Sequence, residues 1–169
     1  AWFFLALQQV LAENRGLRDK VQVDIYGSFD GGSEQEMRRL QLEDLVVCHG
    51  LVPRQQAIEA IQKTDCLLLI QNIIYFSCET IPSKVYEYLL SERPIIGLLH
   101  NNKELEAMLQ ENGHWAVPAT DMQAVITAIR GTLDDFAREG DGVVIKSTVR
   151  EWTVAQAVNE LIRLAEVKK

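Results

Sequence analysis

The first residues of the chain place apolar side chains at helical spacing. They recur every three or four positions, with glutamine, glutamate and asparagine between them, at Phe3, Phe4, Leu7, Val10 and Leu11. This spacing puts them on one face of a helix. Gly16 follows at a position where a helix C-cap is common. The pattern predicts a surface helix that packs this face against an apolar core.

Short apolar runs then alternate with helical patterns along the rest of the chain. The runs that predict strands lie at 21–26, 45–49, 66–70, 94–99 and 115–117, and the helical patterns at 33–42, 54–62, 82–90, 103–110, 122–136 and 152–167. The run at 66–70 does not alternate with polar residues, which is typical of a parallel strand covered on both faces. This order predicts an α/β fold, a Rossmann-like doubly wound parallel sheet with helices on both faces.

Composition and charge indicate a globular domain and exclude some classes of binding partner. The chain has 169 residues, 47% of them hydrophobic, which suits one ordinary domain with a sizeable core. Acidic residues number 24 and basic residues 17, for a formal charge of −7, and no basic cluster interrupts the acidity. Binding to nucleic-acid backbones depends on cationic side chains. We therefore expect no nucleic-acid partner.

The cysteines and histidines indicate neither a disulfide framework nor a metal site. Cys48, Cys66 and Cys78 are odd in number, lie in or beside apolar runs, and lack close-paired metal-ligand spacing. The histidines have no spacing typical of zinc, and His49 fits a strand residue better than a ligand. The opening has neither a basic segment nor a small-residue cleavage site. We therefore expect a cytoplasmic protein.

The segment after the run at 66–70 carries the chemistry best suited to a binding site. In doubly wound sheets, ligands bind beyond the carboxyl ends of the strands. Here Glu79 and Glu87 stand eight positions apart, and Pro82 between them suits the first turn of a helix. Glu79 would then lie in the loop that enters the helix, and Glu87 inside the helix on the face of Ser83. Each glutamate also fits an ordinary surface position.

The predicted helix start could hold a phosphate. Its first backbone N–H groups are unpaired and carry partial positive charge, and the hydroxyl of Thr80 or Ser83 could cap one of them. Lys84 in this first turn opposes the helix dipole at a cost of roughly a few tenths of a kcal/mol. That cost is small on a solvated surface, and the charge is useful beside a bound phosphate. Lys84 therefore fits either an exposed cation or a phosphate ligand.

These residues resemble a known signature. The stretch Glu79-Thr-Ile-Pro-Ser-Lys-Val-Tyr-Glu87-Tyr-Leu-Leu-Ser-Glu-Arg-Pro94-Ile-Ile is similar to the donor-binding signature of retaining glycosyltransferases with the two-domain GT-B architecture, of the group 1 or family 4 type. The segments 23–27, 46–53 and 147–152 resemble the family's nucleotide-side strand, its base-side strand and loop, and the start of its closing helix. The resemblance covers essentially the whole chain.

The resemblance implies a role for each matching residue. Glu79 is the catalytic-site carboxylate that hydrogen-bonds hydroxyls of the donor sugar, and Glu87 binds the ribose of the nucleotide. The other matches surround the donor: Thr80, Ile81, Pro82, Ser83 and Lys84 at the diphosphate, Gly27 on the nucleotide side, and Leu51 and Val52 at the base. The implied donor is a nucleoside-diphosphate sugar, with no metal or other cofactor required. The implied acceptor is a glycan, a lipid or a small molecule.

The family's architecture also implies a longer protein. The first strand of this domain and the amino-terminal acceptor domain would precede residue 1. Residues 1–169 would then be the carboxyl-terminal donor domain, inactive alone and partnered by its own missing domain, which could bring the protein to the inner face of the membrane. Two positions depart from the family's pattern. Thr80 replaces a small residue, and Glu92 replaces a helix-ending glycine, which predicts a left-handed backbone there.

Two other functions stay open. A nucleotide-sugar epimerase of GT-B type would share the architecture and act on the donor without an acceptor. A noncatalytic α/β binding module of the receiver or flavodoxin type would show no affinity for nucleoside diphosphates. A receiver, however, carries paired aspartates after its first strand, where this chain has Gly27 and Ser28.

Overall fold

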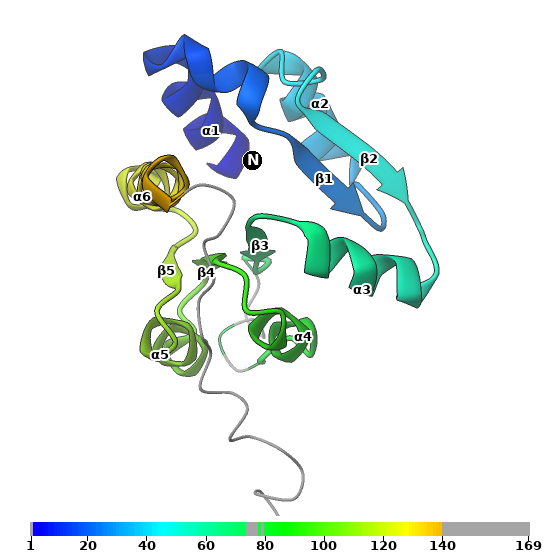
Figure 1. Ribbon diagram of the computed structural model, residues 1–169, viewed down its shortest axis with the longest axis vertical. Coiled ribbons are helices and arrows are strands. Elements are labelled where there is room, and N and C mark those ends of the chain that lie inside the picture. Colours follow the sequence, from blue (N-terminus) through cyan, green and yellow to red (C-terminus); the bar gives the residue numbers. More distant parts are fainter. Residues whose placement is uncertain (1, 74–77, 79, 140–169) are drawn as a thin grey trace, which may run out of the picture.

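The computed structural model describes residues 2–73, 78 and 80–139, which form an α/β fold of parallel strands flanked by helices (Figure 1). In chain order the elements are α1 (Trp2–Glu13), the 3₁₀ helix η1 (Arg15–Lys20), β1 (Val23–Tyr26), α2 (Gly31–Arg39), β2 (Val46–Gly50), α3 (Arg54–Lys63), β3 (Leu67–Ile70), α4 (Lys84–Leu90), β4 (Ile95–Leu99), α5 (Lys103–Glu111), β5 (Trp115–Pro118) and α6 (Met122–Glu139).

The predicted elements are confirmed with shifts of a few residues at their ends. The 3₁₀ helix η1 was not predicted. Helix α2 begins two residues early because Asp30 caps it, accepting a hydrogen bond from the Ser33 amide. Hydrogen bonding by the Ser33 side chain, and then by this amide, lowers the pKa of the Asp30 carboxyl. The helix predicted at 152–167, with the similar segment 147–152, lies outside the described residues.

The described strands form two small sheets. In one, β1 pairs with β2, and in the other β4 lies between β3 and β5; every pairing is parallel. The predicted α/β class and parallel pairing are therefore confirmed. The single continuous sheet of the prediction is not seen among these strands, because no described pairing joins β1 to β3.

Two apolar clusters cover the two faces of the three-stranded sheet. Ile96 and Leu98 of β4 belong to a cluster with α1, α2 and α6, and Ile95 and Leu99 belong to one with α4 and α5. Figure 1 shows α4 and α5 on the side of this sheet opposite α1 and α6. The predicted apolar face of the opening helix is confirmed, since all five of its residues are buried: Phe3, Phe4, Leu7, Val10 and Leu11.

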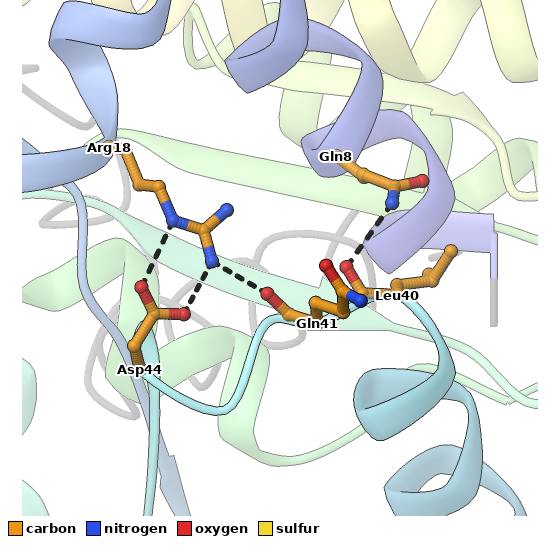
Figure 2. Close-up of polar contacts among 5 residues, drawn as sticks. All are labelled: Gln8, Arg18, Leu40, Gln41 and Asp44. Carbon is orange, nitrogen blue, oxygen red and sulfur yellow. Dashed lines mark hydrogen bonds and ion pairs between the residues drawn. The ribbon is translucent and has the colours of Figure 1, made fainter.

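Polar contacts hold the connection between α2 and β2 (Figure 2). Gln41 has a φ of 55°, and its carbonyl oxygen accepts from Nη2 of Arg18 at 2.6 Å. The Arg18 guanidinium also donates to both carboxylate oxygens of Asp44, at 2.6 and 3.0 Å, which lowers the pKa of that carboxyl. Gln8 of α1 donates to the Leu40 carbonyl at 3.2 Å. These bonds fix the two-stranded sheet relative to α1.

Among the described residues, no helix combines the length and the apolar composition that crossing a bilayer requires.

Candidate functional site

The carboxyl ends of β1 and β2 both turn at glycine. Gly27 has a φ of 116° and Gly50 a φ of 69°, and the Gly27 amide donates to the Gly50 carbonyl at 2.7 Å. L side chains rarely adopt such angles. Among the described residues, a Cβ built at either glycine would meet no atom within 4 Å, so the described side chains leave this edge open. The structure thus places the predicted residue Gly27 at a side-chain-free opening.

The predicted base-side residues follow β2. Leu51 is 90% exposed, whereas Val52 is half-buried. An isolated exposed leucine is common on protein surfaces. Here, however, it lies at the carboxyl end of a strand, next to the opening at Gly50, where an apolar ligand surface could cover it.

Two buried amides anchor the segment that leads into α4. The side chains of Gln71, directly after β3, and Asn102, just after β4, both donate to the Thr80 carbonyl, at 3.3 and 3.0 Å. Gln71 also accepts from the His100 amide at 3.2 Å. Sequence reasoning missed both residues, although an amide side chain just beyond a buried strand was the available signal. Their contacts set the position of the predicted diphosphate segment.

We expect Asn102→Ala to lower the free energy of unfolding by about 1–3 kcal/mol. Asn102 is nearly fully buried, its Oδ1 accepts from the Leu105 amide at the start of α5, and its amide group donates to Thr80. The substitution would remove a helix cap and a buried hydrogen bond together. Urea unfolding measures the loss. Asn14→Ala is the control, since Asn14 makes no side-chain cap hydrogen bond; an equal loss in both variants would contradict the expectation.

Helix α4 begins at Lys84, two residues later than predicted. Pro82 therefore lies in the turn before the helix, where its carbonyl accepts from the Val85 amide at 3.0 Å. Ser83 occupies the N-cap position and makes no side-chain cap hydrogen bond. The reason is that its backbone is already helical, with φ −56° and ψ −31°, whereas capping side chains need an extended backbone. The predicted capping role of Ser83 is wrong.

Lys84 presents a cation at this helix start. Its side chain reaches the surface, while partial burial of the ammonium group lowers its pKa. Among the described residues, no carboxylate forms an ion pair with Lys84. The lysine is therefore available to an anionic ligand.

Glu87 lies in the first turn of α4 and pairs with a residue from the base-side segment. Nη2 of Arg54 donates to Oε1 of Glu87 at 2.7 Å. Arg54 is the first residue of α3 and follows directly after Leu51, Val52 and Pro53. The structure thus brings Glu87 close to the segment predicted to border the base. Sequence reasoning missed Arg54, because no local pattern relates it to Glu87.

Of the other predicted residues in this segment, one packs in the core, one lies on the surface and one lies outside the described residues. Ile81 is partly buried and packs on the apolar cluster beneath α4. Thr80 is exposed, with its carbonyl anchored as above. Glu79, the predicted sugar-binding carboxylate, lies outside the described residues. At the far end of α4, Glu92 has a φ of 58°, so the predicted left-handed backbone is confirmed.

A polar cluster occupies the exposed side of the two-stranded sheet. Nε2 of His49 lies 2.6 Å from Oδ1 of Asp24, and the Tyr26 ring stacks on the His49 ring with centroids 4.3 Å apart. His49 is a strand residue, as predicted. Within the described part of the chain, no group of three or more histidine, cysteine or acidic side chains could hold a metal ion.

Two hollows occur elsewhere in the described structure. An open groove of about 620 Å³ follows α3 and is lined by Arg54, Gln55, Ile58, Glu59 and Gln62. A smaller cavity of about 30 Å³ lies where β4 and β5 begin, lined by residues that include His114, Thr132 and Asp135. Arg54 lines the groove and also contacts Glu87 in the candidate site. The smaller cavity lies at the other ends of the strands, where β4 and β5 begin.

Comparison with protein-family models and with curated proteins finds no match for the chain. The functional argument therefore rests on the residues and contacts above.

Proposed function

We propose that the chain is the donor-binding domain of a retaining glycosyltransferase of GT-B architecture. The whole protein would transfer a sugar from a nucleoside-diphosphate sugar to a glycan, lipid or small-molecule acceptor. The observation that carries this proposal is the contact between Arg54 and Glu87. It supports the proposal because Glu87, to which the resemblance assigns the ribose, lies beside the segment predicted to border the base, as one nucleotide that spans both would require.

In this proposal each part of the donor contacts a side chain of suitable charge or polarity. The Glu87 carboxylate only accepts hydrogen bonds, which suits the vicinal hydroxyls of ribose. Lys84, unpaired by any described carboxylate, would offset the charge of the diphosphate as it leaves, a form of electrostatic stabilisation. Leu51 and Val52 would cover the base. Glu79 would bind hydroxyls of the sugar, and the reaction would need no metal.

The strand order supports a doubly wound arrangement completed by one more strand. A common doubly wound sheet has the strand order 3-2-1-4-5-6. In that order, β2 and β1 would be strands 3 and 2, and β3, β4 and β5 would be strands 4, 5 and 6. Strand 1 would then lie between β1 and β3. The amides of Val23 and Gly27 donate toward β2, and those of Leu67 and Gln71 toward β4. The intervening backbone groups of β1 and β3 therefore point to their other edges. We propose that one further strand pairs there and completes a doubly wound sheet.

The proposal predicts selective nucleotide binding that depends on Glu87. In calorimetric titrations with uridine, guanosine and adenosine diphosphates, we expect one to bind preferentially. Glu87→Ala should weaken that binding roughly ten-fold or more, since hydrogen bonds to a charged group are lost. Glu106→Ala is the matched control, because Glu106 is also a first-turn glutamate in an ion pair, with Lys103 at 2.9 Å.

Two outcomes would contradict the proposal. Unchanged affinity in Glu87→Ala would remove the site assignment. Absence of binding to all three diphosphates would favour a noncatalytic α/β module instead. An epimerase would bind nucleotide as well, and is distinguished by converting the donor sugar without an acceptor.

A further inference from the structure

The contact between Arg54 and Glu87 uses only part of each side chain. The two residues are 33 positions apart, and a single donor, Nη2 of Arg54, meets a single acceptor, Oε1 of Glu87, at 2.7 Å. The second carboxylate oxygen, Oε2, has no hydrogen-bond partner among the described residues. Glu87 is thus held at one oxygen and open at the other.

The fold does not need this pair for stability. The side chain of Arg54 is 80% exposed and that of Glu87 is 41% exposed. Exposed ion pairs contribute little to stability because water screens them and two long side chains lose conformational freedom. Helix α4 is held instead by Val85 and Leu89, which are fully buried in the cluster with β3, β4 and α5. The pair is therefore free to serve a role other than holding the fold.

We infer that Arg54 is a positioning residue for Glu87: it holds the carboxylate so that Oε2 can accept a hydrogen bond from the ribose of the bound nucleotide. This inference rests on the proposed function. A glutamate side chain on a helix surface samples several rotamers, and fixing one before the ligand arrives lowers the entropy lost on binding.

The position of Arg54 in the chain places it beside both the base-side segment and Glu87. Arg54 opens α3 directly after Leu51, Val52 and Pro53, and it also lines the groove along α3. A base seated against Leu51 and Val52 would therefore lie close to the residue that orients Glu87. The hydrogen bond between Arg54 and Glu87 then links the segment that would contact the base to the carboxylate that would contact the ribose.

The test separates positioning of the ribose contact from a general effect on folding. The probes are the tightest-binding of the uridine, guanosine and adenosine diphosphates and its 2′,3′-dideoxy form, titrated calorimetrically into the chain. We expect Arg54→Ala to weaken the ribonucleotide roughly three- to ten-fold and to leave the dideoxynucleotide nearly unchanged. Arg54→Lys should recover part of the difference, because lysine supplies the charge without the planar donor geometry.

Arg38→Ala is the matched control. Arg38 donates from Nη2 to Oε1 of Glu34 at the same 2.7 Å, in an exposed pair on α2, and we expect its loss to change neither affinity. Equal weakening of both nucleotides by Arg54→Ala, or no weakening of either, would overturn the positioning role. If Glu87→Ala still weakens the ribonucleotide, only this inference fails. If Glu87→Ala has no effect, the proposed function fails with it.

Discussion

Leu89→Ala is expected to lower the free energy of unfolding by about 2–5 kcal/mol, the range for truncating a large buried side chain. Leu89 lies on the inner side of α4 with no exposed surface, in the cluster that includes Leu67, Leu69 and Leu105. The substitution removes the transfer free energy of the lost methyl groups and leaves a cavity where the surroundings cannot fully relax. Because α4 carries Lys84 and Glu87, the loss would also loosen the candidate site.

The neighbouring residue provides a matched control for this prediction. Leu90 follows Leu89 on the same helix and is 62% exposed. Leu90→Ala removes the same atoms at nearly the same backbone position, so we expect a change within about 0.5 kcal/mol. Urea unfolding of the two variants, followed by circular dichroism, measures both values. Similar losses at the two positions would show that α4 is not packed as the structure has it.

The second large effect is a loss of stability in acid caused by His114. This residue lies directly before β5 and is only 6% exposed. Neither ring nitrogen has a hydrogen-bond partner among the described residues, and burial lowers the pKa of the imidazole to about 4. The titratable group that shares its cavity is Asp135 of α6, which is itself paired with Arg138. The folded chain therefore favours neutral His114.

The direction of the pH dependence follows from this lowered pKa. An unfolded histidine takes up its proton near pH 6.5, whereas the folded chain resists protonation until about pH 4. The contribution of His114 to stability is therefore fully present above pH 6.5 and is lost as the pH falls toward 4. The total loss is about 3 kcal/mol, from the pKa difference and 1.36 kcal/mol per unit.

Unfolding free energies measured between pH 7.5 and 4 in wild type and His114→Leu test this prediction. The difference between the two curves isolates His114, because carboxyls with lowered pKa values, such as Asp30 and Asp44, act equally in both. We expect the wild type to lose more stability over this range than His114→Leu. His100→Gln is the control and should follow the wild-type curve. Parallel curves for wild type and His114→Leu would refute the prediction.

Short-range patterns in the sequence were enough to predict the elements. The buried face of α1 follows from the spacing of Phe3, Leu7 and Val10, because a helix of 3.6 residues per turn puts such positions on one side. The unalternated run at 66–70 predicted a parallel strand, and β3 does pair in parallel, with β4. These two predictions depend on a few neighbouring residues. The left-handed backbone at Glu92 was predicted instead from the glycine that the resembling family has at this position.

The candidate site could be predicted only as a set of positions. The sequence singled out Glu87 by its spacing from Glu79 and Lys84 by its place in the first turn of a predicted helix, and the family resemblance added Gly27. The sequence did not predict that Gln71 and Asn102 both donate to the Thr80 carbonyl. These residues are 9 and 22 positions from Thr80, and the packing of two strand ends brings them to it.

The sequence by itself determined the α/β class, the order of the elements and which helix faces are apolar, since these depend on local periodicity and backbone preference. Only the tertiary structure decided that the described strands form two sheets, that Arg54 reaches Glu87, and that His114 is buried with no hydrogen-bond partner from the described part of the chain. The physical reason is that such contacts depend on how distant elements pack in three dimensions. Packing is set by the whole core, and no local pattern of residues encodes it.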